Sequence, residues 1–240
     1  MTEILEVAEL DFALEPFDWG FARERAADIA ANWAKRRASQ PKLFDGRVLL
    51  NSHYEFTSRA DGRLALRGAF FETAYSNFLS WRDFGSPDAS VLNGFSMAAL
   101  RSADGAFLLG EMSAHTANAG QIYFAAGTPD LTDVFDGKVD LLASVKRELE
   151  EETGVAASEA TLDPDWIVVR APPMLACMKV FRSPLTAEAL QARIHAFLAS
   201  ERDPELARVH IARTTQDLDG LRATHFVREF IEYASAAASR

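Results

Sequence analysis

Apolar residues along this chain follow two patterns, one with helical spacing and one typical of short strands. Between residues 21 and 38, for example, Ile29, Ala30 and Trp33 recur on one helix face. The same spacing predicts further helices over 71–82, 141–153, 186–200 and 221–234. Strands are predicted over 5–15, 48–56, 64–68, 95–101, 106–111, 121–125, 166–170, 174–181 and 207–212. Many short strands with a few helices between them favour an α/β or α+β sandwich.

A single strong break divides the pattern. Residues 85–88 read Gly-Ser-Pro-Asp, which are turn-forming residues between two apolar segments. We therefore expect a domain boundary near residue 90. Residues 1–90 would form an N-terminal α+β subdomain, and residues 91–240 would form a second domain.

Composition and charge narrow the possible partners. The 240 residues are 48% hydrophobic and carry a formal net charge of −10. Nucleic acids and anionic membranes would repel such a chain, so we expect neither as a partner. A phosphorylated substrate would need cations to mediate its contact. The start of the chain has no basic region followed by an apolar run, which predicts a cytoplasmic protein.

By sequence, neither the single cysteine nor the histidines form a catalytic or metal-binding pattern. Cys177 stands alone, so no intrachain disulfide is possible, and its apolar neighbours predict a buried structural residue. The five histidines show no metal-binding spacing. They are His53, His115, His195, His210 and His225.

The segment 141–154 contains the most informative pattern in the chain. On a helical wheel at about 100° per residue, with Arg147 at zero, Leu142, Val145 and Leu149 cluster near roughly 160–220°. Three acids form a contiguous face beside that apolar stripe, at roughly 40–140°. They are Glu148, Glu151 and Glu152. Glu150 points elsewhere, near roughly 300°.

Such an acidic face opposes helix stability. Glu148 repels Glu152 at i,i+4 and Glu151 at i,i+3, and each like-charge pair costs roughly 0.2–0.5 kcal/mol. The acids also lie near the helix C-terminus, where the helix dipole prefers cations. A solvated acidic face is the simpler interpretation. A bound hard cation such as Mg²⁺ or Mn²⁺ would remove the conflict, and clustered carboxylates suit it.

Residues 147–155 resemble the second half of the Nudix box. The family pattern reads Arg-Glu, an aliphatic residue, any residue, Glu-Glu, any residue, Gly and an aliphatic residue, and this chain reads Arg-Glu-Leu-Glu-Glu-Glu-Thr-Gly-Val. The resemblance implies a Nudix-type α/β/α sandwich with an N-terminal α+β extension. It also implies hydrolysis of nucleoside diphosphate derivatives. Glu148, Glu151 and Glu152 would be the metal ligands, and Arg147, Glu148 and Glu152 the catalytic residues.

The first half of the box departs from the family pattern. The position of its glycine is Asp133, and the position of its first glutamate is Val139. Gly127 is the nearest suitable glycine, which implies a loop about six residues longer than the family's. Asp136 and Asp140 are the nearby acids that we expect to replace the missing glutamate.

The family mechanism requires a base that takes a proton from the attacking water. One of the box glutamates is a candidate, and Glu205, in the segment Asp-Pro-Glu before a predicted strand, is another. An exposed loop acid is the alternative interpretation of Glu205.

The substrate can be predicted only from a looser resemblance. Residues 33–46 and 75–79 are similar to the start of the animal Nudix protein that splits UDP-glucose. The resemblance implies a UDP-sugar, hydrolysed to UMP and a sugar 1-phosphate. ADP-ribose and other nucleoside diphosphate derivatives remain alternatives. A further alternative is a Nudix domain that senses a nucleotide without cutting it.

Overall fold

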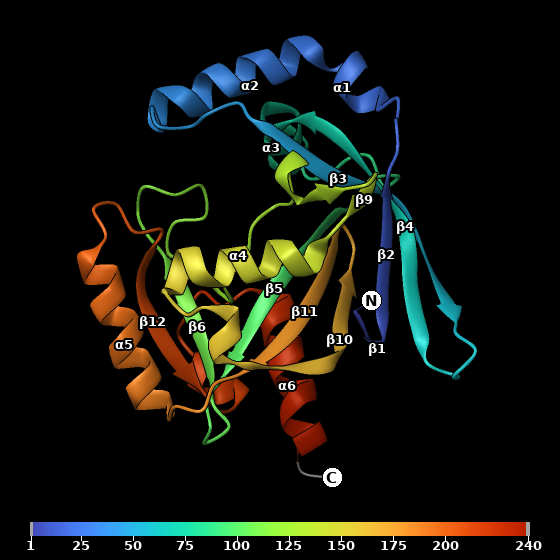
Figure 1. Cartoon of the computed structure of the whole chain (residues 1–240). Coiled ribbons are helices and arrows are strands. Elements are labelled where there is room, and N and C mark those ends of the chain that lie inside the picture. Colours follow the sequence, from blue (N-terminus) through green and yellow to red (C-terminus); the bar gives the residue numbers. More distant parts are fainter. Residues whose placement is uncertain (1, 239–240) are drawn as a thin grey trace.

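The computed structural model describes residues 2–238 and contains two β-sheets (Figure 1). The larger sheet has seven strands in the order β1-β10-β11-β5-β6-β12, with β7 paired to β6. Only β11 and β5 run parallel within it. Their bounds are β1 Glu3–Val7, β5 Asn93–Arg101, β6 Phe107–Met112, β7 Ile122–Tyr123, β10 Thr161–Ala171, β11 Met174–Arg182 and β12 Leu206–Ala212.

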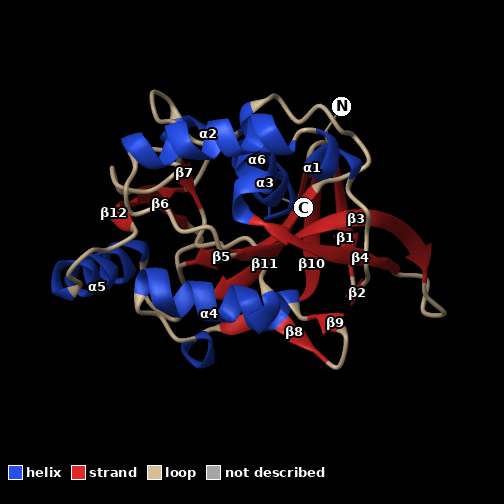
Figure 2. Cartoon of the chain, turned by 90° about the horizontal axis from the view of Figure 1, so that it is seen from above, coloured by secondary structure: helices blue, strands red, loops and turns tan. Residues whose placement is uncertain are grey.

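Helices cover both faces of the larger sheet. Helix α4 (Leu141–Thr153) lies on one face and α6 (His225–Ala238) on the other, as the view from above shows (Figure 2). Side chains of successive β5 residues point to opposite faces of the sheet. The Ser96 hydroxyl donates to the Leu141 carbonyl of α4 at 3.0 Å, while the Phe95 ring packs 5.7 Å from Phe226 of α6. Helix α5 (Ala187–Ser200) packs beside β12. The predicted mixed α+β class is therefore confirmed.

The smaller sheet has five strands in the order β3-β4-β2-β9-β8. Their bounds are β2 Glu9–Leu14, β3 Arg47–Ser58, β4 Leu64–Ala74, β8 Val134–Phe135 and β9 Lys138–Val139. Helices α1 (Gly20–Glu24), α2 (Ala26–Ser39) and α3 (Tyr75–Asp83) accompany it, and α2 runs across the top of the molecule in Figure 1. Short 3₁₀ helices occur at Leu131–Asp133, Ala157–Glu159 and Thr215–Leu218.

The two sheets take strands from both sides of residue 90. Strand β1 pairs with β10 in the larger sheet, and β9 pairs with β2 in the smaller one. A separate core lies between α1, α2, α3 and the smaller sheet, around the buried Trp19, Phe71 and Trp81. The division at residue 90 remains a prediction about folding units.

The structure changes the length of some predicted elements. The predicted helix over 71–82 begins only at Tyr75, because residues up to Ala74 pair with β3. The predicted strand over 121–125 is reduced to two residues, and β8 and β9 were not predicted. Among residues 2–238, no helix is long and apolar enough to span a bilayer.

Candidate active site

Helix α4 is fixed at both ends by its own sequence. The Asp140 carboxylate caps the first turn by accepting hydrogen bonds from the Leu142 and Ala143 amides, at 3.0 and 2.9 Å. The last turn ends at Gly154, which adopts the left-handed conformation with φ of 67°. A Cβ on Gly154 would lie 2.5 Å from the Phe197 ring, so glycine is required there for two reasons. The predicted helix over 141–153 is therefore confirmed.

The acids of α4 differ strongly in exposure. Glu152 is only 4% exposed, the Glu148 side chain 13% and the Glu151 side chain 59%. Glu150 is exposed and faces away from the buried stripe, as the helical wheel predicted. The three predicted ligands thus form two buried carboxylates and one exposed carboxylate.

The start of the loop after β7 contacts both buried carboxylates. The Ala126 amide donates to Glu152 Oε1 at 3.3 Å, while Glu152 Oε2 is buried and has no partner among the described residues. A Cβ on Gly127 would lie 2.2 Å from Glu148 Oε1. Only glycine allows the backbone to approach the carboxylate this closely.

Burial dominates the electrostatics of these two acids. It raises the pKa of Glu148 to about 7, although the charge of Arg147 opposes the shift, and Glu151 and Glu205 add to it. Burial also raises the pKa of Glu152 well above its ordinary value, and the charges of Glu148 and Glu205 reinforce that effect. Without a cation, the site therefore favours the protonated form of at least one carboxyl.

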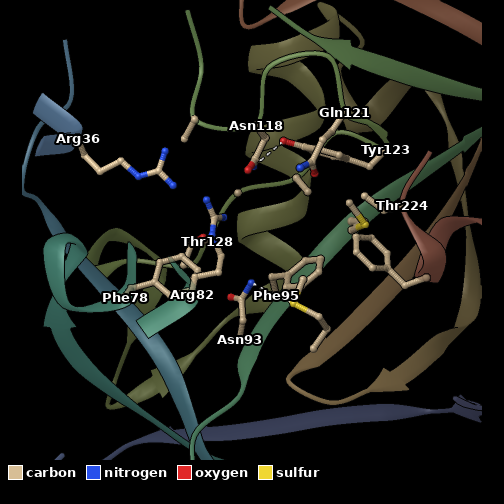
Figure 3. Close-up of a pocket in the computed structure, with 16 residues that line it drawn as sticks. Arg36, Phe78, Arg82, Asn93, Phe95, Asn118, Gln121, Tyr123, Thr128 and Thr224 are labelled. Carbon is tan, nitrogen blue, oxygen red and sulfur yellow. Dashed lines mark hydrogen bonds between the residues drawn. The ribbon is translucent and has the colours of Figure 1, made fainter. Parts of the chain in front are cut away.

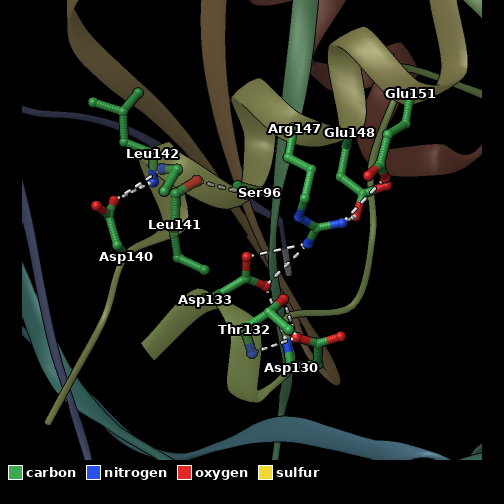
Figure 4. Close-up of polar contacts among 11 residues, drawn as sticks. Ser96, Asp130, Thr132, Asp133, Asp140, Leu141, Leu142, Arg147, Glu148 and Glu151 are labelled. Carbon is green, nitrogen blue, oxygen red and sulfur yellow. Dashed lines mark hydrogen bonds and ion pairs between the residues drawn. The ribbon is translucent and has the colours of Figure 1, made fainter. Parts of the chain in front are cut away.

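Arg147 connects the helix to the preceding loop. Its guanidinium donates to Glu148 at 2.8 Å, to Glu151 at 3.2 Å and to both oxygens of Asp133 at 3.1 and 3.3 Å (Figure 4). Asp133 is buried, and it also accepts the Asp130 amide at 3.1 Å. Asp133, which stands where the family pattern has its glycine, is thus the buried acid that pairs with Arg147.

The two acids predicted as replacements for the first glutamate lie away from this pairing. Asp136 is exposed in the turn between β8 and β9, with φ of 50°, and Asp140 caps the helix. Neither contacts Arg147. Val139 is buried in β9, where an acid would lose its hydration. The sequence did not indicate Asp133, because it stands at the glycine position of the family pattern.

Glu205 lies close to the buried acids. Its charge raises the pKa of both Glu148 and Glu152. The surrounding loop is held to Ser113, whose amide donates to the Glu205 carbonyl at 2.7 Å and whose hydroxyl donates to the Pro204 carbonyl at 2.8 Å. Glu205 lines a cavity of about 350 Å³ with His115 and Tyr123. A distant loop thus places a fourth acid beside the three acids of α4.

A second cavity, of about 430 Å³, adjoins the same loop. Ala126 and Gly127 form part of its wall, so the residues that contact the carboxylates also face this space. Arg36 of α2 and Arg82 of α3 point into it from the N-terminal part of the chain (Figure 3). Sequence reasoning missed both arginines, because nothing in their local pattern separates them from other helix-surface cations.

Two of the three carboxylates predicted as metal ligands pair with Arg147. Among residues 2–238, no group of three His, Cys, Asp or Glu side chains forms a ready-made metal site. Glu148 and Glu151 pair with Arg147, whereas Glu152 accepts the Ala126 amide. The donor chemistry still suits a hard cation, since Glu152 has a buried oxygen without a partner and Glu148 is buried beside it.

The single cysteine lies outside this site. Cys177 is buried in β11, and burial raises the pKa of its thiol to about 12. It is a packing residue, as predicted.

No protein-family model matches this sequence, and no curated protein matches it. Solved structures are similar to part of the chain, and the following are three of them. The MutT protein from Methanosarcina mazei Go1 shares 18% identity, with 62% of this chain and 96% of that chain covered and a TM-score of 0.38. The Nudix hydrolase RenU from M. smegmatis shares 10% identity, with 61% and 84% covered and a TM-score of 0.38. The protein DR0079 from Deinococcus radiodurans shares 13% identity, with 79% and 99% covered and a TM-score of 0.45. Identities and TM-scores this low assign neither a family nor an activity to this chain.

Proposed function

We propose that this chain is a Nudix-type hydrolase that cleaves the diphosphate linkage of a nucleoside diphosphate derivative with the help of Mg²⁺ or Mn²⁺. One observation supports the proposal above all others. Two buried carboxylates, Glu148 and Glu152, contact a glycine-containing loop whose residues Ala126 and Gly127 also line a 430 Å³ cavity. A helix that had only a structural role would gain nothing from burying two acids side by side.

The metal ligands would be Glu148, Glu152 and Glu151. A bound divalent cation neutralises phosphate charge and polarises the attacking water. Arg147 is the positioning residue. It fixes Glu148 on one side and is itself fixed by the buried Asp133, so the ligand is oriented before substrate arrives.

Two residues are candidates for the base. Glu152 is one of them, because its buried Oε2 has no hydrogen-bond partner among residues 2–238. Glu205 is exposed, on a loop held by Ser113. We assign the role to Glu152 first, because it is buried beside Glu148 in α4, whereas Glu205 lies at an exposed loop position.

A UDP-sugar, hydrolysed to UMP and a sugar 1-phosphate, is the substrate we favour. The N-terminal part of the chain lines the cavity with Arg36, Phe78 and Arg82, which is consistent with its role in specificity. Arg82 carries its guanidinium 5.5 Å from the centre of the Phe78 ring. No carboxylate among residues 2–238 forms an ion pair with it. In a chain of net charge −10, an arginine of this kind facing a cavity favours an anionic ligand.

A substrate panel tests both the reaction and the choice of substrate. UDP-glucose, ADP-ribose, NADH and a nucleoside triphosphate are assayed side by side with Mg²⁺, with phosphomonoester release as the readout. We expect the highest kcat/KM for UDP-glucose. A higher value for ADP-ribose or the triphosphate would reject the UDP-sugar and retain the hydrolase.

Metal removal tests the mechanism. Treatment with a chelator is expected to abolish turnover, and Mg²⁺ or Mn²⁺ should restore it. Undiminished turnover after thorough chelation would contradict the metal-dependent reaction. Nucleotide binding without any turnover, with either metal present, would favour the sensing domain.

A further inference from the structure

The wall of the 430 Å³ cavity combines flat apolar surfaces with polar groups. Four aromatic side chains from four different elements face it, and they are Phe78 of α3, Phe95 of β5, Tyr123 of β7 and Phe226 of α6. The Tyr123 ring is fixed in place, because Asn118 donates to its hydroxyl at 3.1 Å (Figure 3). Cavities of this size that combine aromatic walls with convergent polar groups are typical of sites for planar ligands.

Asn93 is the most unusual polar group in this wall. It is the first residue of β5 and is only 6% exposed. Among residues 2–238, its Nδ2 donates only to the Met174 sulfur, at 3.7 Å, and its Oδ1 is buried without a partner. Leaving a buried acceptor unpaired costs about 1–3 kcal/mol. The acceptor of this amide and one of its two N–H donors thus have no partner in the described part of the chain.

A second buried group points to the same space. The Thr224 hydroxyl, just before α6, also has no hydrogen-bond partner among residues 2–238. It lines the cavity together with Asn93. Two unpartnered polar groups on different elements of one cavity indicate that the missing partners belong to a ligand.

We propose that this cavity is the nucleobase subsite and that Asn93 is a specificity-determining residue. The Asn93 Oδ1 accepts a hydrogen bond from an N–H of the base, and Nδ2 donates to the adjacent ring nitrogen or carbonyl oxygen. The aromatic side chains cover the faces of the base, and Thr224 contacts its edge. The identity of the ligand as a nucleotide rests on the proposed function, whereas the available donor and acceptor rest on the geometry.

The arrangement of charges supports this orientation. Arg36 and Arg82 face the cavity from α2 and α3, and Ala126 and Gly127 line it beside the carboxylates. The base would lie against Asn93 and the aromatic rings, and the phosphates would lie between the arginines and the carboxylates. A sugar in the aromatic part would leave most of its hydroxyls without partners, so a planar base suits that part better.

Metal-free binding tests the proposal without any turnover. Affinities of UMP, CMP, AMP, GMP and ribose 5-phosphate are measured by calorimetry in the presence of chelator. At least one nucleotide should bind about tenfold or more tightly than ribose 5-phosphate, since one good hydrogen bond with stacking supplies that difference. Equal affinity for all five ligands would overturn the proposal.

Three variants assign the effect to the cavity wall. Asn93→Leu should reduce the advantage of the preferred nucleotide by about tenfold and leave ribose 5-phosphate unchanged. Thr224→Val removes a hydroxyl that has no partner among residues 2–238. It should reduce the advantage of the preferred nucleotide over ribose 5-phosphate by a smaller factor. Gln191→Leu is the matched control, because this amide holds β12 from α5, at 2.8 Å from the Val209 carbonyl. Unchanged nucleotide affinity in both cavity variants would reject the subsite.

The outcomes separate this proposal from the proposed function. Base-dependent binding without hydrolysis of any substrate would reject the hydrolase and keep the subsite. Hydrolysis of a substrate together with base-independent binding would keep the hydrolase and reject the subsite. If Asn93→Leu lowered the melting temperature much more than Gln191→Leu, the nucleotide affinity of Thr224→Val alone would decide whether the subsite is kept or rejected.

Discussion

Two adjacent regions of the chain, residues 127–140 and residues 141–154, build one site by different means. In α4 every relation among the acids follows from the helical repeat, so Glu150 is exposed and Glu152 buried as the wheel predicts. The preceding segment contains a 3₁₀ turn and two short strands that join the smaller sheet. Its contribution to the site, Asp133, depends on where the rest of the chain lies. Local periodicity predicts the first region, and only the fold determines the second.

The largest expected effect concerns the helix. Glu152→Gln should lower kcat by on the order of 10²-fold or more, because it removes the free buried oxygen that would hold a metal or a proton. The fold should survive, since glutamine can still accept the Ala126 amide and no longer repels Glu148. Steady-state kinetics on the preferred substrate give the measurement.

Glu150→Gln is the matched control for that variant. It makes the same chemical change two residues earlier, on the exposed face of α4, and should leave kcat within about twofold. Equal losses in the two variants would mean that the acidic face of α4 is not the site.

The sequence could predict the helix with its acids, because capping, periodicity and the glycine stop are all local. Asp140 and Gly154 define its ends within the segment itself. The substrate cavity could not be predicted in the same way. Arg82 and Asn93 are only eleven positions apart, yet one belongs to α3 and the other to β5, and neither lies in a motif. Their proximity results from the packing of α3 and α2 above the larger sheet (Figure 1).

Glu205 occupies an intermediate position in this comparison. A short sequence pattern before a predicted strand indicated it, and β12 does begin at Leu206. Its closeness to Glu148 and Glu152 required the contact with Ser113, which no pattern in the sequence reveals. Its role as the base remains a prediction.

The second prediction concerns stability in the absence of metal. The folded-state pKa of Glu148, about 7, exceeds the ordinary value of 4.5, so its folded form binds the proton more tightly than its unfolded form. Its contribution is therefore fully present below pH 4.5 and is lost as the pH rises through about 7. Glu152 acts in the same direction.

Glu148→Gln isolates this contribution. In chelator, urea denaturation at pH 5 and pH 8 should show that the wild type loses about 2–3 kcal/mol more than the variant over this interval. Glu150→Gln should follow the wild type, since Glu150 is exposed. An equal or larger loss in Glu148→Gln would show that Glu148 is not held in a protonation-sensitive environment.

The smallest expected effect concerns the loop, and it tests the region that the sequence predicted least well. Asp133→Asn keeps the size of a buried side chain and its acceptor for the Asp130 amide, but it removes the charge that pairs with Arg147. Arg147 retains Glu148 and Glu151, so we expect a loss of about 1–2 kcal/mol in the free energy of unfolding and a kcat reduced severalfold.

Asp136→Asn removes an acid three positions later in the same segment, from an exposed turn with positive φ that asparagine tolerates. It should change neither quantity. Urea denaturation and steady-state kinetics on both variants measure the difference. If Asp136→Asn were the damaging change, the loop would act through its turn, and the Asp133–Arg147 pair would have no part in positioning Glu148.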